Sequence, residues 1–414
     1  MPARRRTAKS LANDVIVRRA VINEIVASGV DRIGPTAVAR RAGFTTGAIY
    51  GRYENSVEMV IDVWLTELWP RYAALLEGIV AAVVDHPAAG AGPSGGAAVP
   101  AAGLDGALGD LLDPPAWVLA ATEVLAVAHR SDELAEVIRP EFRRFLDRCH
   151  AGVDAPPRRR TTVLLVVGAV IGCGVHELAD LRIDAMVPMF DWARRAGAAD
   201  AGPLGPLELP DVGELEVDTG ELERDRLIGA CIEVIADVGF ERATISRIAR
   251  RAGIGTHEVY AEHAAKLDLL VDAIDVFIES LLNPAVEHNL AEGSAQATPM
   301  GAAALALSAF LDPARRTARL ARLEALVAAR HYPALAEGLD GMWRELLDRY
   351  VGAVDLAVPG LAETSRPALY YLAAELSGLP VVDALAGPVS DVDWRLGLLP
   401  FEQVAIDTWR ASAS

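Results

Sequence analysis

Two short blocks of the sequence place hydroxyl, phenol and guanidinium side chains at matching positions. The first is AVARRAGFTTGAIYGRY at residues 37–53, and the second is RIARRAGIGTHEVYAEH at residues 247–263. Such groups donate hydrogen bonds to phosphate oxygens, and small side chains beside them let a helix approach base edges closely. The chemistry that these residue types favour is recognition of a nucleic acid.

The first block carries the local signals of two short helices joined by a tight turn. Pro35 suits the first turn of a helix, where its missing N–H would have no partner. Gly43 permits the turn, and the Thr45 hydroxyl can cap a second helix that we expect to run to about Tyr53. The pattern predicts a helix-turn-helix, whose second helix enters the major groove. Its expected core residues are Val38, Ala39 and Ile49.

These residues resemble the tetracycline-repressor (TetR) family of transcriptional regulators. The resemblance rests on the A-x-x-A-G turn, the Thr45 cap, Gly47 in the recognition helix, and an Ile-Tyr pair closed by Tyr53. It is strong over residues 11–60 and weaker over 221–272. It implies a DNA-binding regulator, expected to be a repressor, whose helical ligand-binding and dimerisation body couples a small hydrophobic effector to release from an operator.

The resemblance also implies which side chains contact DNA. Base contacts are assigned to Thr36, Thr46, Gly47 and Ala48, and backbone contacts to Arg40, Thr45, Tyr50 and Arg52. The second block contributes Thr256, Tyr260 and Lys266. The first block departs from the family at Ser56, where a lysine is frequent and where the second block has Lys266.

The second block differs in charge on its recognition helix. His257, Glu258 and Glu262 stand where the first block has Gly47, Ala48 and Arg52, and His263 replaces Tyr53. Each approach of a carboxylate to a phosphate costs on the order of 1–4 kcal/mol at an effective dielectric constant near 20. Two interpretations stay open. The second helix-turn-helix reads a different, weaker half-site, or it survives only as a packing unit.

The blocks belong to a longer internal repeat. The offset is 210 around the blocks and 201 further on, where EVLAVAHRSDELAE at 123–136 matches EALVAARHYPALAE at 324–337. The sequence therefore predicts two homologous units. The expected boundaries are a helix-turn-helix domain at 11–60, a helical regulatory domain at 61–195, a linker at 196–220, a second helix-turn-helix domain at 221–272 and a second regulatory domain at 273–414.

Composition and periodicity predict an all-α, cytoplasmic protein. The 414 residues are 52% hydrophobic, mostly Ala, Leu and Val, and apolar residues recur at helical spacing, as at Val15, Ile22, Ile25 and Val26. Only three cysteines occur, without a CxxC, and no apolar run reaches the length of a membrane span. The net charge is −18, yet residues 1–56 carry +6. A basic end on an acidic body suits a protein that touches DNA at one end.

Late in each unit, an apolar run contains small residues. Gly168, Gly172 and Gly174 lie in the first run, and Ala373, Ala374 and Gly378 in the second. These runs are expected to be closely packing interface helices or ordinary core helices. As interface helices they would make one chain an intramolecular pseudo-dimer that prefers an asymmetric operator, with a further homodimer still open.

Two other function classes have less support. Cys173 and His176 lie three residues apart, but no third ligand or orienting acid accompanies them, so we expect packing rather than catalysis, and no cofactor, metal or membrane partner. The remaining alternative is a helical scaffold with vestigial heads. The basic arm of Arg4, Arg5 and Arg6 argues against it, because such an arm adds DNA contacts that a scaffold does not need.

Overall fold

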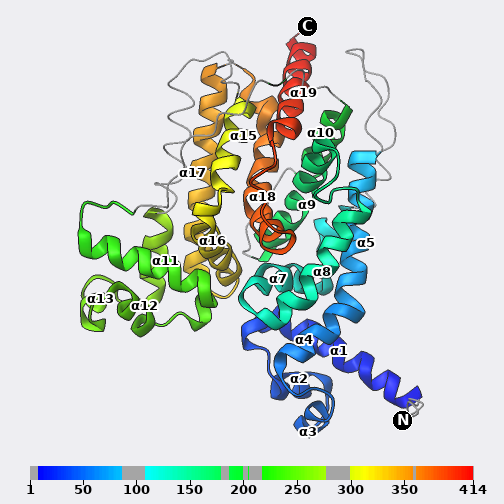
Figure 1. The fold of residues 1–414 in the computed structure, drawn as a ribbon, viewed down its shortest axis with the longest axis vertical. Coiled ribbons are helices and arrows are strands. Elements are labelled where there is room, and N and C mark those ends of the chain that lie inside the picture. Colours follow the sequence, from blue (N-terminus) through cyan, green and yellow to red (C-terminus); the bar gives the residue numbers. More distant parts are fainter. Residues whose placement is uncertain are drawn as a thin grey trace.

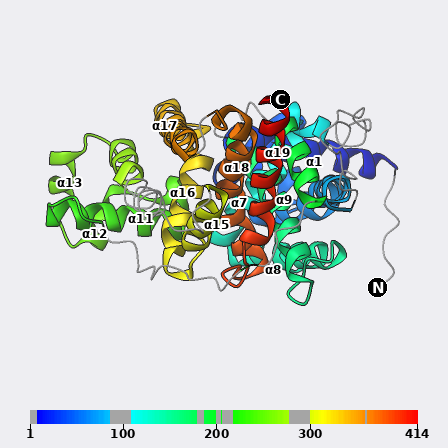
Figure 2. The ribbon, with the colours of Figure 1, turned by 90° about the horizontal axis from the view of Figure 1, so that it is seen from above.

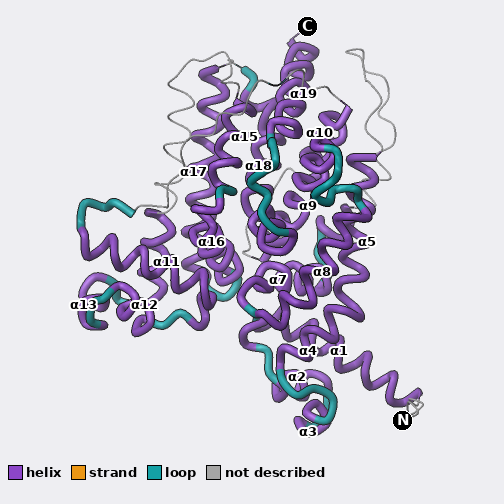
Figure 3. The backbone as a smooth tube through the Cα atoms, viewed as in Figure 1, coloured by secondary structure: helices purple, strands orange, loops and turns teal. Residues whose placement is uncertain are grey.

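The structure is a computed structural model that describes residues 8–85, 108–178, 186–198, 204, 217–276, 299–357 and 360–413. Within these ranges every regular element is a helix and no strand occurs, as Figure 3 shows by colour. The predicted all-α class is confirmed. The predicted arm Arg4–Arg6 and most of the predicted linker 196–220 lie outside the described residues.

The first part of the chain forms a series of helices that ends near residue 198. They are α1 (Ala8–Ser28), α2 (Pro35–Ala42), α3 (Thr46–Tyr50), α4 (Ser56–Val63), α5 (Trp69–Val80), α7 (Ala116–Val127), α8 (Asp132–Arg148), α9 (Pro157–Leu178) and α10 (Met186–Ala198). A π-helical turn, Trp64–Leu68, joins α4 to α5, and a 3-10 turn, Ala128–Arg130, joins α7 to α8.

The second part repeats this order in outline. Its helices are α11 (Leu222–Arg242), α12 (Ile245–Ala252), α13 (Thr256–Glu262), α15 (Pro299–Phe310), α16 (Arg316–Ala329), α17 (Pro333–Ala357), α18 (Ala362–Ala386) and α19 (Arg395–Ala413). Residues 266–276 are also helical. In both parts a 21-residue helix precedes an 8-residue helix and then a short one.

The long helices gather into one body from which two smaller groups project. In Figure 1, α2 and α3 lie at the bottom and α11–α13 at the left, with α7 and α16 between them. Figure 2, the view from above, again places α11–α13 at one end of the molecule. We call α1–α3 the first head and α11–α13 the second head.

Local chemistry explains the turn in each head. Gly43 and Gly253 follow α2 and α12 with φ of 71° and 74°, a left-handed conformation that glycine adopts at little cost. Pro35 occupies the first turn of α2, and the predicted core residues Val38, Ala39 and Ile49 are buried. These predictions are confirmed.

Two sequence expectations about the first head are wrong. The recognition helix α3 ends at Tyr50 rather than near Tyr53, because Tyr53 turns into the core. Val15 is 58% exposed although its spacing placed it on the buried face. The N-terminal turns of α1 extend away from the body in Figure 1, so burial begins only at Val17.

The body is centred on α9 and α18, which cross at backbone contact. A Cβ on Gly172 would overlap the carbonyl of Ala374, and a Cβ on Gly378 would overlap the carbonyl of Gly168. The expected close packing of these two runs is thus confirmed, and α9 and α18 pack against each other. Gly174 instead faces Thr122 of its own series.

The expectation that no apolar run reaches the length of a membrane span is wrong for these two helices, which are long and apolar enough by length and composition. Their candidate windows, Pro157–Glu177 and Arg366–Ala386, are 83% and 89% buried inside the protein. A helix that is packed on all sides by other helices is apolar all round. The burial of these two helices therefore accounts for their composition.

Gly378→Ala tests the close contact. The added methyl group must push α9 away from α18, so we expect a loss of about 1–3 kcal/mol in the free energy of unfolding, measured by urea titration. Gly78→Ala is the control, because a Cβ there meets nothing within 4 Å and Ala favours a helix by up to about 1 kcal/mol. Equal stability of the two variants would contradict the packing.

Candidate nucleic-acid interface

The first head exposes polar side chains along α2 and α3. The side chains of Thr36, Arg40, Thr45 and Tyr50 are exposed, as is Gly47, while Thr46 and Ala48 are half-buried. Tyr50 is 59% exposed, unusual for a large aromatic side chain. Most of the residues expected to contact DNA from the first head are therefore exposed.

A side-chain cap fixes the start of the recognition helix. The Thr45 hydroxyl accepts a hydrogen bond from the Ala48 amide at 3.3 Å, as predicted. The cap satisfies one of the free amides at the helix start. The remaining N-terminal amides and the helix dipole favour negative charge at this end, where a phosphate would lie.

Arg52 is engaged within the head rather than free. Its Nε lies 3.3 Å from Oδ1 of Asp14, and its Nη1 donates to the Ala48 carbonyl at 2.8 Å. In the second head both charges are reversed at the aligned positions: Arg224 replaces Asp14, and Glu262 replaces Arg52. The hydrogen bond to Asp272 is the main cause of the raised pKa of Arg224, and Glu262 adds a smaller attraction. The exchange of Arg52 for Glu262 thus preserves an attraction inside the head.

A half-buried carboxylate holds each head to the helix that follows it. In the first head, Asp62 accepts from Tyr53 at 2.8 Å and from Arg18 at 3.0 Å. In the second, the aligned Asp272 faces His263 at 3.0 Å and Arg224 at 2.5 Å. The aligned donors Tyr53 and His263 differ in type, and the arginine comes from a different position in each head, yet the acceptor is retained. This cluster was missed from the sequence because one donor changes type and the other does not align.

Glu258 has a structural role that sequence reasoning also missed. Its carboxylate accepts a hydrogen bond from the Gly255 amide and so caps α13. Gly255 aligns with Thr45, whose hydroxyl accepts from the Ala48 amide, so the glutamate caps a different amide at a helix start that has lost its hydroxyl cap. The signal was available, because a glutamate three residues after a helix start is the acidic half of a capping box.

Of the three residues of the second head that were expected to contact DNA, two are exposed and one points inward. Thr256 and Tyr260 are exposed, Tyr260 by 57%. Lys266 points inward: its Nζ donates to the Phe240 carbonyl at 2.7 Å and lies 3.9 Å from the centre of the Phe240 ring. Burial lowers the pKa of this lysine. The structure therefore gives Lys266 a partner within the head.

The second head also carries a basic groove between α11 and α12. Three arginines of α12, Arg247, Arg250 and Arg251, line it together with Asp237 and two valines of α11. Arg251 pairs with Glu233, so its charge is partly neutralised. The net charge of −1 over residues 221–266 concealed this local concentration of positive charge.

An exposed recognition helix, capped at its N-terminus and set after a left-handed glycine turn, defines a helix-turn-helix DNA-binding protein. Comparison with known proteins agrees. The HTH-type transcriptional regulator BetI of Escherichia coli strain UMN026 is 31% identical over 176 residues, as is the protein of that name from strain K12. The match spans 86% of each relative and 41% of this chain.

The chain belongs to the TetR family of helix-turn-helix transcriptional regulators. No family model matches the chain. Because the same 176 residues make up 86% of the relative and 41% of this chain, this chain is about twice as long as the relative.

The Asp272 cluster predicts a pH-dependent contribution to stability. Burial alone would raise the pKa of Asp272, but hydrogen bonds from Arg224 and His263 outweigh it and lower the pKa below 3.8. A lowered pKa in the folded state stabilises the protein above the ordinary pKa, and this stabilisation is lost as pH falls through the folded value.

Asp272→Asn should therefore lower the thermal midpoint most above about pH 5, with the difference from wild type shrinking below pH 3.8. Thermal melts over a pH series measure this. Asp237→Asn, a change at an exposed carboxylate of the same head, is the control. A difference that stays constant with pH would show that Asp272 makes no such contribution.

Proposed function

We propose that the chain is a single-chain pseudo-dimer that represses transcription, reads an asymmetric DNA site mainly through its first head, and releases it on binding a small hydrophobic effector. The observation that carries the proposal is the reciprocal contact of α9 and α18. Gly172 meets Ala374, and Gly378 meets Gly168, which is reciprocal when the two helices are paired at an offset of 206, Gly168 with Ala374 and Gly172 with Gly378. The two residues on each helix are four apart, so each helix offers the same small-residue pair to the other.

This reciprocity is the mark of a two-fold interface, in which residue i contacts j and the counterpart of j contacts the counterpart of i. The α10 and α19 helices also pack together beside α9 and α18. A chain about twice as long as its relative, with two helix series of the same order, fits an internal dimer. Such a unit needs no second copy to place two heads on one duplex.

The first head supplies the better reading surface. It has the exposed hydroxyls of Thr36 and Thr45, a net charge of +6 over residues 1–56, and no carboxylate on α3. The second head offers Thr256, Tyr260 and the arginines of its groove, which suits contacts to the phosphate backbone, but Glu258 and Glu262 are exposed on its recognition helix. Two unequal heads favour an asymmetric site.

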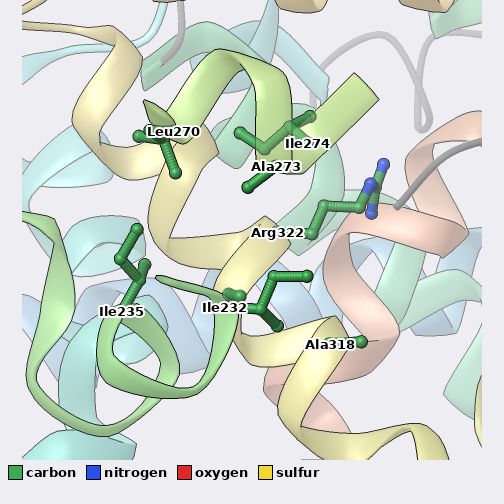
Figure 4. A pocket seen from close by; sticks show the side chains of 8 residues that line it. Ile232, Ile235, Leu270, Ala273, Ile274, Ala318 and Arg322 are labelled. Carbon is green, nitrogen blue, oxygen red and sulfur yellow. The ribbon is translucent and has the colours of Figure 1, made fainter. Parts of the chain in front are cut away.

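The effector proposal rests on the family, and a small apolar cavity marks a place where an effector would act on the second head. It lies between α11, residues 266–276 and α16, and Ile232, Leu270, Ile274 and the stem of Arg322 line it (Figure 4). Its volume of about 10 Å³ is enough for one water molecule. An effector that enters must move α11 relative to α16, which would shift the second head.

An effector that acts in this way must raise the thermal midpoint of the protein and weaken its DNA binding together, because the two equilibria are linked. A screen of small hydrophobic compounds by thermal shift, followed by DNA titration, measures both. Compounds that stabilise the protein and leave DNA affinity unchanged would contradict release by this route.

Selection of binding sites from a random pool of duplexes tests the reading of DNA. Tyr50 and Tyr260 form a matched pair, since both are more than half exposed and their loss costs little packing. We expect Tyr50→Ala to lower affinity for the selected site at least about tenfold, equivalent to about 1.4 kcal/mol. Tyr260→Ala should lower it by roughly two- to threefold, because it removes only a weaker phosphate contact.

Val153→Ala, at a body residue that is 79% exposed, is the control and should bind as wild type does. Equal losses from Tyr50→Ala and Tyr260→Ala would show that both heads read DNA alike. No enriched site at low salt would overturn the regulator proposal in favour of a scaffold.

A further inference from the structure

A buried cluster of charged residues lies between the two heads, outside the surface that would touch DNA. It is built where α1 and α11 end against the turns that follow α7 and α16. We call Asp31, Glu123, Arg130, Glu324 and Arg330 the joint. Glu123 and Glu324 are 2% exposed, and the side chain of Arg130 is 6% exposed.

Arg130 is the centre of the joint because it reaches both heads. Its Nη1 donates to Asp31, just past the end of α1, at 2.6 Å and to the Val238 carbonyl near the end of α11 at 3.4 Å. Its Nε lies 2.9 Å from Glu324 of α16. One guanidinium thus binds the first head, the second head and the second half of the body.

Glu123 makes the reciprocal connection. Its carboxylate accepts from the Val30 amide of the first head at 2.6 Å and from Arg330 of the second half at 3.1 Å. In the internal alignment Glu123 corresponds to Glu324, and the pair His129-Arg130 to Arg330-His331. Each half therefore sends one arginine to the buried glutamate of the other.

Glycines leave the space that the joint occupies. A Cβ on Gly239, in the second head, would overlap the guanidinium of Arg130. At the aligned Gly29, in the first head, a Cβ would lie 3.1 Å from Glu123 and 3.3 Å from His331. The chain turns at Gly29, with φ of 84°, and at Gly239, with φ of 78°, and then enters the helix-turn-helix of each head.

Charge within the joint depends on the arginines. Burial lowers the pKa of His129 to about 4, so this histidine, 3.4 Å from Glu324, is neutral near pH 7. Burial also raises the pKa of Glu324 to about 8, and Arg130 opposes that shift. Arg130 is thus the group that draws Glu324 towards its carboxylate form, against the effect of burial.

From this arrangement we infer that Arg130, Glu123 and Glu324 are positioning residues that fix the distance between the two heads and hence the spacing of the half-sites that the chain accepts. The consequence for half-site spacing rests on the proposed function. The fixed distance between the heads does not depend on it. A buried ion pair constrains geometry more than it adds stability, because the cost of removing both charges from water offsets their attraction.

Distances between spin labels on the heads test the fixed distance without DNA. Glu54→Cys and Ala264→Cys place labels at aligned, exposed positions, and the three native cysteines are buried. We expect one narrow distance distribution in the labelled parent protein. Arg130→Met should broaden or shift it, and Arg130→Lys, which keeps a charge but loses the planar fork, should give an intermediate result.

Asp391→Asn is the matched control. It removes an ion pair with Arg160 that also joins the two halves but is exposed at Asp391 and lies outside the joint. Its distribution should equal that of the parent. If Arg130→Met does not fold, judged by circular dichroism, Glu324→Gln keeps the side-chain volume and carries the same expectation.

An unchanged distribution in a folded Arg130→Met or Glu324→Gln protein overturns the inference. Site selection then supplies the second readout: the parent should select one half-site spacing, and Arg130→Met should bind that site about tenfold more weakly while accepting neighbouring spacings. A parent protein that selects no DNA, together with the expected distance change, would defeat the proposed function and leave the joint as a device that positions the heads.

Discussion

The arrangement depends on one steric constraint, the backbone contact between α9 and α18. Gly168, Gly172 and Gly378 have no side chain at the crossing, and any Cβ at the last two would meet a carbonyl group. Close-packed interiors do not absorb such an overlap without movement of whole helices. The crossing therefore fixes how the two helix series face each other, and through them where α1 and α11 begin their heads.

The two heads keep the same backbone while their side chains have diverged. Both use a left-handed glycine after the first short helix and a half-buried aspartate behind the recognition helix. The side chains around these points have been exchanged in compensating ways. Glu258 caps where Thr45 capped, and Arg224 with Glu262 reverses Asp14 with Arg52. Differences that look unfavourable for DNA binding thus also have roles inside the head.

Local signals in the sequence predicted the local structure well. Pro35, Gly43 and Thr45 each act through their own backbone conformation or nearest amides, so their effects can be read without the fold. Tyr53 and Val15 were misplaced because their burial depends on what packs against them. The helical period gives a face but does not say where the body ends.

The contacts between distant residues could not be predicted. Asp62 and Asp272 keep their acceptor but change both donors, and Arg130 contacts residues about a hundred or more positions away along the chain. The internal alignment placed Glu123 opposite Glu324 but gave no reason to bring either near an arginine of the other half. The domain boundaries and DNA contacts remain predictions, although most of the residues named for the first head are exposed.

The mass of the protein–DNA complex tests the central claim, that one chain is a complete two-headed unit. Sedimentation equilibrium of the protein with its selected duplex gives the number of chains bound. The account predicts one chain of 43.9 kDa on each duplex, with contacts from both heads. Two chains on every duplex, with one head of each engaged, would contradict it and assign the dimer to a second copy of the chain.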